Sequence, residues 1–352
     1  MNTAVTPLFS PDELDRGLLQ QALRERARAM VPRLRERAPH TAELHHLPEE
    51  TVEEMIEAGF LRILQPARHG GYELDPKDFF HVQITLAEGC MSTAWVLGVV
   101  AIHNWQLALF DERAQRDVWG TNEDTLISSS YMPVGKVKRA EGGYRLSGKW
   151  SFSSGSEHCN WAFLGAMVPP EKEGDMPDYR TFLVPRGEYR IEVNWDVSGL
   201  EGTGSDVVVV EDAFVPEYRT HRAIDGFNCS SPGNAVNTNP LFRLPFGQIF
   251  VRAVCSSSIG ALQATAAAGN LPAIEDRVKM RYDAALVAPK CADAVNKLLI
   301  HSGAQSIYRS HPINRAWLDI NAGRTHVANN AGKFARNRGA CQFGFTGEDI
   351  FL

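Results

Sequence analysis

The sequence lacks long apolar runs, clustered cysteines and an excess of basic residues. Its longest apolar stretch with no more than one glycine covers residues 94–102, far short of the ~20 residues that a bilayer span needs. Residues 1–5 do not form a basic segment followed by an apolar one, so no signal peptide is expected. The cysteines lie far apart, at Cys90, Cys159, Cys229, Cys255, Cys291 and Cys341. No C-x-x-C spacing occurs, so we expect a reduced, cytoplasmic protein without a zinc site or a disulfide framework.

The charge balance is mildly acidic, with 36 Lys and Arg residues against 42 Asp and Glu residues and a net charge of −6. A nucleic-acid-binding protein would show a basic stripe, so that class is excluded. The 44% hydrophobic and 22% charged residues are typical of a folded globular protein. A chain of 352 residues has room for one large core or for a few packed lobes.

The first third of the chain has a helical pattern. One helix is predicted over residues 48–58, where Gly59 supplies the usual C-terminal signal, and two more over residues 76–90 and 92–110. The last of these segments is apolar around most of its circumference. A helix of that kind is buried, so we expect it at the centre of a helical bundle.

The middle of the chain, residues 125–216, shows the period of two that is typical of strands. Glu141-Gly142-Gly143 predicts a hairpin turn between residues 134–138 and 144–146. Further strands are predicted at residues 162–168, 179–184, 190–195 and 207–214. Because no helix separates them, we expect an antiparallel β-domain. The stretch 225–240 is rich in Ser, Asn, Gly and Pro and is interpreted as a linker.

Helical composition returns after this linker, with helices predicted over residues 251–268 and 276–301. The predicted fold class is therefore α+β. We expect an N-terminal helical domain over residues 1–122, a central antiparallel β-domain over 123–225 and a C-terminal helical bundle over 226–352.

Hydroxyl-bearing side chains gather in three segments. Residues 128–130 are all serine, and residues 151–158 contain four more serines. Such hydroxyls can hydrogen-bond a heteroaromatic ring or an oxyanion, and they also occur in ordinary turns. Residues 199–205, Gly-Leu-Glu-Gly-Thr-Gly-Ser, either let the backbone approach a planar ligand closely or form a plain glycine hairpin.

Two histidines are candidate functional residues. His103 lies in the apolar 92–110 helix, where it is either a core histidine bonded within the protein or a group that faces a buried ligand. His326 lies near the C-terminus among small residues and asparagines. No H-x-x-x-H or H-E-x-x-H spacing occurs, so no metal site is expected.

Taken together, these segments resemble the acyl-CoA dehydrogenase superfamily, in which α-, β- and α-domains surround a flavin. The resemblance is carried by residues 54–60, 65–66 and 70–71, and by the hairpin at 143–149. In dehydrogenases the strand after this hairpin continues to a Trp-Ile-Thr triplet, whereas Phe152, Ser153 and Ser154 stand at the matching positions here.

Within the superfamily, the chain is more similar to the oxygenase components of two-component flavin monooxygenases, the group of p-hydroxyphenylacetate hydroxylase and the secosteroid phenol hydroxylase. The similarity rests on the order and spacing of several segments. These are Thr93-Ala94-Trp95, His103 followed by Gln106, and residues 128–137, 153–158 and 214–219.

This resemblance implies an oxygenase that takes reduced FMN or FAD, as a diffusible co-substrate, from a separate flavin reductase. With O₂ it would hydroxylate a small phenolic substrate ortho to its hydroxyl, through a C4a-hydroperoxyflavin. The resemblance also implies a homotetramer. The open alternatives are an N- or S-oxygenating monooxygenase, a flavin dehydrogenase or oxidase on the same fold, and a non-catalytic flavin-binding protein.

The resemblance also assigns roles to individual residues. Ser154 is placed at flavin N5, His103 and Ser129 hold the phenolic oxygen, and His326 lies by the reacting edge of the flavin. The other residues assigned to the flavin are Ser153, Trp195, Thr203 and Ser205. A dehydrogenase needs a carboxylate base in the C-terminal helices, but no Asp or Glu occurs between Asp319 and Glu348. His326 falls close to that position, and a histidine suits a phenol, with a pKa of about 10, better than a carbon acid.

One departure from the family pattern concerns the segment after Ala268. Gly269-Asn270-Leu271-Pro272 follows at once, where the family's helix normally continues into a loop and a second long helix. Either the chain is a natural or engineered short form, or the given sequence skips a segment of the C-terminal bundle at this point. We favour the second, because removing a helix pair would expose apolar bundle surface.

Overall fold

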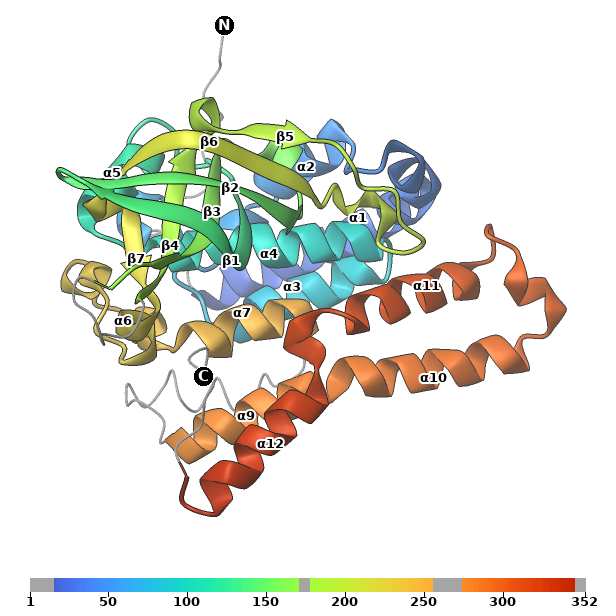
Figure 1. Ribbon diagram of the computed structural model, residues 1–352. Coiled ribbons are helices and arrows are strands. Elements are labelled where there is room, and N and C mark those ends of the chain that lie inside the picture. Colours follow the sequence, from blue (N-terminus) through green and yellow to red (C-terminus); the bar gives the residue numbers. More distant parts are fainter. Residues whose placement is uncertain (1–15, 171–177, 256–273, 346–352) are drawn as a thin grey trace, which may run out of the picture.

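A seven-stranded sheet lies against a layer of helices in the computed structural model, which describes residues 16–170, 178–255 and 274–345 (Figure 1). The helices that precede the sheet are α1 (Arg16–Leu44), α2 (Glu49–Glu57), α3 (Pro76–Ala87), α4 (Met91–Leu107) and α5 (Glu112–Trp119). The α+β class with helices on both sides of the sheet in the sequence is confirmed.

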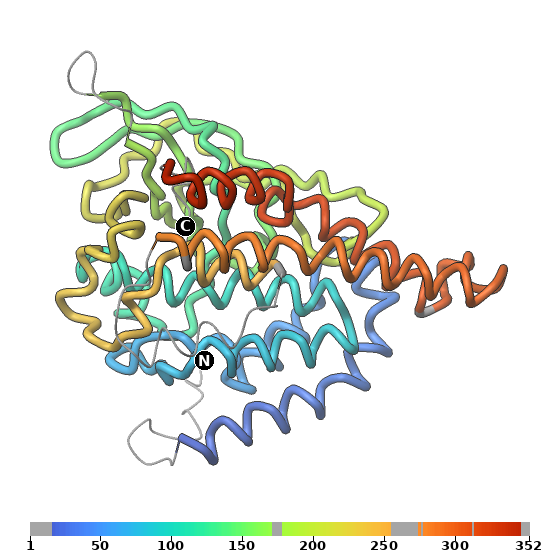
Figure 2. Tube along the Cα trace, turned by 90° about the horizontal axis from the view of Figure 1, so that it is seen from below, coloured from blue at the N-terminus to red at the C-terminus, as the bar shows by residue number. Residues whose placement is uncertain are grey.

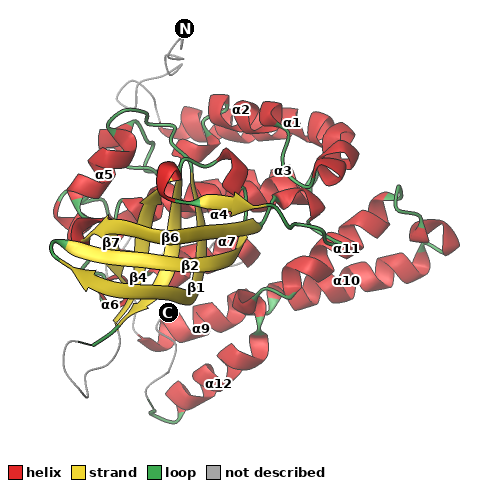
Figure 3. Cartoon of the chain, turned by 45° about the horizontal axis from the view of Figure 1, so that its top comes forward, coloured by secondary structure: helices red, strands yellow, loops and turns green. Residues whose placement is uncertain are grey.

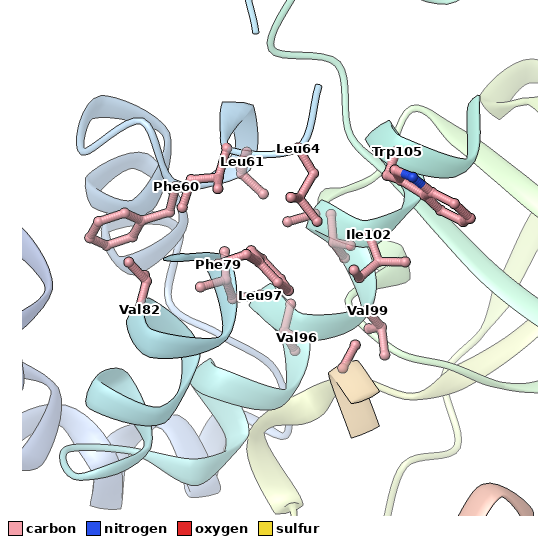
Figure 4. Close-up of a cluster of buried hydrophobic side chains, with 14 of the residues drawn as sticks. Phe60, Leu61, Leu64, Phe79, Val82, Val96, Leu97, Val99, Ile102 and Trp105 are labelled. Carbon is pink, nitrogen blue, oxygen red and sulfur yellow. The ribbon is translucent and has the colours of Figure 1, made fainter. Parts of the chain in front are cut away.

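Helix α4 forms the centre of the helical layer. Every residue from Ser92 to Leu107 is buried, so the prediction of a central buried helix is confirmed. Figure 4 shows apolar side chains of α4, such as Leu97 and Ile102, facing Phe79 of α3 and the turn at Phe60. A helix surrounded in this way holds its few polar side chains in fixed positions, since close-packed interiors leave little room for them to move.

The sheet contains the strand order β5-β6-β2-β1-β3-β4-β7, and its curvature is visible in Figure 3. The strands are β1 (Ile127–Ala140), β2 (Gly143–Ser153), β3 (Trp161–Val168), β4 (Asp178–Pro185), β5 (Arg190–Glu192), β6 (Asp206–Pro216) and β7 (Thr220–Arg222). The predicted hairpin is β1–β2, and its turn places Gly142 at a φ of 73°, which glycine adopts without strain. We propose 122 and 225 as the boundaries of the domain that holds this sheet.

The prediction of a wholly antiparallel β-domain is wrong at one pair of strands. β1 pairs in parallel with β3, from Ile127 opposite Trp161 to Gly135 opposite Ala166, so the sheet is mixed. Successive strands β1, β2 and β3 alternate in direction, so β1 and β3 run in the same direction. β6 occupies the free side of β2, so β3 pairs beside β1 instead, and this pairing is parallel.

The linker predicted over residues 225–240 is also wrong, because this stretch folds against the helical layer. It contains part of α6 (Ala223–Phe227) and a 3-10 turn at Pro232–Ala235. The buried Asn237 side chain donates to Ala108 O over 2.8 Å, just after α4. Amide side chains that satisfy backbone carbonyls in this way allow a polar segment to be buried.

The C-terminal helices are α7 (Phe246–Cys255), α9 (Ile274–Ala285), α10 (Val287–His301), α11 (Pro312–Arg324) and α12 (Ala331–Gln342). The prediction of a single helix over residues 276–301 is wrong, because the helix is interrupted at Leu286, between α9 and α10. Pro289 has no N–H and stands in the first turn of α10, where none is needed. The predicted helix 251–268 and the departure after Ala268 fall partly or wholly on residues 256–273, outside the described residues.

Helices α10 and α11 form a hairpin that extends away from the rest of the molecule in Figures 1 and 2. In the described part of the chain, no helix is long and apolar enough to cross a membrane.

Candidate active site

A chain of buried hydroxyl groups lies where the end of β2 meets α4. Ser154 Oγ lies 2.7 Å from Ser205 Oγ, which lies 2.7 Å from Thr203 Oγ1. The Trp95 indole N–H, on α4, donates to Ser154 Oγ over 3.2 Å. Three of the residues that the resemblance assigned to the flavin are thus in one hydrogen-bonded group. Trp95 was quoted in the sequence only as part of a motif, and the structure gives it this contact.

An aromatic pair stands beside these hydroxyls. Phe152 has a left-handed backbone, with a φ of 64°, and its ring is 63% exposed. This ring lies edge-on to Trp195, with 6.1 Å between the ring centroids. Between Phe152 and Ser154, the Ser153 hydroxyl is buried and has no hydrogen-bond partner in the structure. Exposed aromatic rings next to available hydroxyls fit a planar heteroaromatic ligand such as a flavin ring.

The loop between Trp195 and Thr203 is held by carboxylates from two elements. Asp206 Oδ1, on β6, accepts the backbone N–H of Trp195 over 3.1 Å. Asp319 Oδ1, on α11, accepts the backbone N–H of Leu200 over 2.9 Å, and Leu200 has a left-handed φ of 57°. Burial raises the pKa of Asp319 to about 6. The sequence interpretation used Asp319 only to mark the end of a segment without acids, because a contact over this separation leaves no local signal.

His326 lies at the same end of α4 as these hydroxyls. Its ring centroid is 5.9 Å from that of Trp95, and its Nδ1 accepts the backbone N–H of Ala328 over 3.1 Å. Burial, with a smaller effect of the Arg281 charge, lowers the pKa of His326 to about 4. The neutral ring therefore carries its proton on Nε2, so His326 offers a donor.

His103 lies on α4 with no exposed surface. Its Nδ1 is 2.5 Å from Ile127 O, and since a carbonyl only accepts, Nδ1 carries the proton. His103 Nε2 is buried and has no partner in the structure, so it offers an acceptor. Burial lowers the pKa of His103 to about 4. One ring nitrogen is thus bonded within the protein, while the other has no partner among the described residues, so the ligand-facing interpretation stays a prediction.

Ser129 and His103 share two aromatic neighbours, Phe163 and Tyr131. Ser129 on β1 stands opposite Phe163 on β3, and the His103 ring is edge-on to Phe163 at 5.5 Å. The Ser129 hydroxyl also interacts with the phenol of Tyr131, where it opposes the strong rise in pKa that burial gives this tyrosine. Sequence reasoning missed Tyr131, although its position two residues after Ser129 places both on one face of the strand.

The two groups of residues share one helix. Trp95 and His103 are eight residues apart on α4, about 12 Å along its axis. Gly155, next to Ser154, is close to Val96 and Val100, and a Cβ on Gly155 would lie 2.9 Å from Val96. The hydroxyl chain and His103 are therefore both arranged along α4. Within the described residues no group of three or more His, Cys, Asp or Glu side chains is placed to hold a metal ion.

Two family models match the chain. The N-terminal domain of acyl-CoA dehydrogenase matches residues 19–121, and the C-terminal domain of acyl-CoA dehydrogenase matches residues 251–331. The predicted superfamily is thereby confirmed, including its helical domains on either side of the sheet.

The flavin-dependent monooxygenase oxygenase subunit HsaA of Rhodococcus jostii (strain RHA1) is 36% identical over 383 residues, covering 93% of this chain and 100% of the relative. The crystal structure of the HsaA monooxygenase from M. tuberculosis superposes with a TM-score of 0.90 at 33% identity, covering 95% of this chain and 100% of the other. The chain belongs to the family of flavin-dependent monooxygenase oxygenase subunits. The choice of this family over the dehydrogenases is thus confirmed, and the protein is an enzyme.

A further relative is named for a different aromatic substrate, resorcinol. The oxygenase component of the FADH(2)-dependent resorcinol hydroxylase of Rhizobium sp. (strain MTP-10005) is 36% identical over 255 residues, 72% of this chain and 61% of the relative. The alignment with the R. jostii subunit covers more positions than the 352 of this chain. That relative therefore contains residues without a counterpart in this sequence.

Proposed function

We propose that this protein hydroxylates a phenolic substrate ortho to its hydroxyl group, with O₂ and a reduced flavin supplied by a separate reductase. The observation that carries the proposal is His103, which presents a neutral, buried acceptor nitrogen without a partner among the residues that the structure describes. A phenol hydroxyl is a donor of matching chemistry. The reduced flavin is FAD or FMN, and the name of the Rhizobium relative favours FAD.

His103 and Ser129 have complementary parts in binding the phenol. The Ile127 carbonyl fixes the proton of His103 on Nδ1, so Nε2 accepts the phenol hydroxyl and takes up its proton as the ring is attacked. Loss of this proton makes the ortho carbons more electron-rich. The resulting imidazolium and phenolate attract each other, which offsets the cost of charge in a buried site. In this proposal the Ser129 hydroxyl donates to the phenolic oxygen.

The flavin is assigned to the hydroxyl chain and the aromatic pair. When bound, a reduced flavin supplies the activation of O₂ and the transfer of its oxygen. In this proposal Ser154 and Ser205 hydrogen-bond the polar edge of its ring, with Thr203 behind them. Ser153, the last residue of β2, has a buried hydroxyl without a partner among the described residues. Trp195 offers an aromatic surface. In this proposal His326, as a donor, bonds an oxygen at this edge, and the role of base falls to His103.

The proposal is tested with the purified protein, reduced FAD or FMN and a panel of phenols in ¹⁸O₂-saturated buffer. We expect a catechol that carries one ¹⁸O atom, with reduced flavin and not with oxidised flavin. Oxygenation of amines or thioethers in place of phenols would favour the N- or S-oxygenating alternative. Anaerobic reduction of a bound flavin by an acyl-CoA would favour a dehydrogenase. Flavin binding without any turnover would favour the alternative of a non-catalytic flavin-binding protein.

Ser154→Ala tests the flavin contact. Removing one hydrogen bond of about 0.5–1.5 kcal/mol is expected to raise the ratio of H₂O₂ to hydroxylated product by about 2- to 12-fold. The ratio is measured by peroxidase-coupled detection beside product analysis. Ser130→Ala is the matched control, because the Ser130 hydroxyl donates to Ser151 O instead. Equal ratios in the two variants would remove Ser154 from this role.

We also propose a homotetramer. The α10–α11 hairpin carries apolar side chains that are largely exposed in one chain, Leu298, Ile300, Ile307 and Tyr308. Exposed apolar groups of this kind mark association surfaces. Light scattering at micromolar concentration is expected to give four times the mass of one chain, and a monomer would contradict the proposal.

A further inference from the structure

Tyr131 is a direct neighbour of His103, with the two rings edge-on. It lies on β1, and its ring is edge-on to Phe246 and Phe250 of α7, with 5.3 Å and 5.0 Å between ring centroids. Phe246 and Phe250 stack on each other at 5.2 Å. The Tyr131 ring is therefore packed against a stacked pair of partly buried aromatic rings, which restricts its positions.

The Tyr131 hydroxyl is bonded to α4. It donates to Gln106 Oε1, and Gln106 follows His103 by nearly one helical turn. The rings of Tyr131 and His103 are edge-on, with 6.2 Å between their centroids. The Tyr131 side chain is thus held by a hydrogen bond beside His103 and Ser129, the two residues proposed to bind the phenol of the substrate.

A small cavity lies on the other side of this pair. It has a volume of about 20 Å³ and is lined by Gln106, Tyr131, Tyr179, Thr181, His221 and Phe246, among others. Neither His103 nor Ser129 lines it. The volume is enough for one water molecule. Tyr131 and Gln106 line this cavity and also lie beside His103, so they form the wall between the cavity and the proposed phenol site.

We propose that Tyr131 is a specificity-determining residue, whose ring restricts substrates to phenols without a bulky substituent on the side that faces β1 and α7. This inference rests on the proposed function. Substituents that point elsewhere, toward the flavin side, are not restricted by this wall. Removal of the ring would join the phenol site to the 20 Å³ cavity and give a longer substituent room.

The test uses 4-methylphenol and 4-butylphenol with the complete enzyme, reduced flavin and O₂. In Tyr131→Ala we expect the kcat/KM ratio of 4-butylphenol to 4-methylphenol to rise by on the order of tenfold or more, since each newly buried methylene contributes about fourfold. Tyr131→Leu, which keeps an apolar side chain against Phe246 and Phe250, is expected to change the ratio in the same direction. Tyr131→Leu replaces Tyr131→Ala in the test if the alanine variant does not fold.

Two variants are matched controls. Tyr131→Phe keeps the ring and is expected to keep the wild-type ratio. Tyr179→Phe removes the hydrogen bond to Tyr131 O, 2.6 Å long, behind the wall, and is also expected to keep it. An unchanged ratio in active Tyr131→Ala or Tyr131→Leu enzyme overturns the role of Tyr131 alone. Failure of the wild-type enzyme to hydroxylate any phenol overturns the proposed function and this inference with it.

Discussion

Replacing His103 by asparagine is expected to lower phenol hydroxylation by about 10- to 150-fold while leaving the fold intact. The asparagine amide nitrogen can take the place of Nδ1 and donate to Ile127 O, which lies 2.5 Å from Nδ1 in the wild-type protein. Nothing then occupies the position of Nε2. Loss of a hydrogen bond to a group that becomes charged costs about 1.5–3 kcal/mol, which gives this range.

His103→Gln is the matched variant, because its longer side chain places the amide near Nε2 and leaves Ile127 O without its partner. We expect it to keep more activity than His103→Asn and to be less stable, by the ~1–3 kcal/mol of an unsatisfied buried group. Steady-state hydroxylation, reduced-flavin affinity and urea unfolding are measured on all three proteins. The reverse order, with a stable active asparagine variant and an inactive glutamine variant, would make His103 a structural residue.

Mild acid is expected to destabilise the protein strongly, independently of any substrate. His103 and His221 are buried, and burial lowers the pKa of each from 6.5 to about 4. The unfolded chain therefore binds these protons first, so stability is complete above pH 6.5 and is lost as the pH falls toward 4. Between pH 7.5 and pH 5, each histidine is expected to cost about 2 kcal/mol of the free energy of unfolding.

Asp319 acts in the opposite direction. Its pKa is raised by burial from 3.8 to about 6, so the folded protein holds this proton more tightly, and stability is gained as the pH falls through 6. This offsets about 1 kcal/mol of the loss from His103 and His221. His326, whose pKa burial also lowers to about 4, adds about 2 kcal/mol, so the four groups together give a net loss of roughly 5 kcal/mol. Urea unfolding at the two pH values measures the loss.

Variants separate these contributions. His221→Asn removes one titrating group outside the proposed phenol site and is expected to reduce the loss between pH 7.5 and pH 5, whatever its effect at pH 7.5. Asp319→Asn is expected to increase the loss. A loss that is the same in the wild-type protein and in both variants would mean that the acid sensitivity comes from other groups.

The sequence allowed the order of domains and most elements to be predicted, because hydrophobic period and turn residues are local signals. The buried α4 and the β1–β2 hairpin at Gly142 are of this kind. The parallel β1–β3 pair was not predictable in the same way. This pairing depends on the position of β6 beside β2, and the sequences of β1 and β3 contain no local signal for that position.

The candidate site shows the same division. His103 was found because a histidine is conspicuous on an apolar helix, and Ser154 because its motif resembled a known family. Tyr131 and Asp319 were missed, since tyrosine on a strand and aspartate on a helix are ordinary in sequence. Their interest comes from Gln106 and Leu200, which are remote in the chain and close in space.

The contact between Leu200 and Asp319 has a consequence for the order in which the molecule becomes functional. The loop that carries Thr203 is completed by a carboxylate of α11, and Trp95 meets His326 just beyond that helix. During synthesis, domains generally fold as they emerge, from the N-terminus onward. The helical layer and the sheet can therefore form early, while the loop 195–203, to which we assign flavin binding, is completed only by the last part of the chain. A nascent chain that ends before α11 is expected to fold its sheet without gaining the ability to retain flavin.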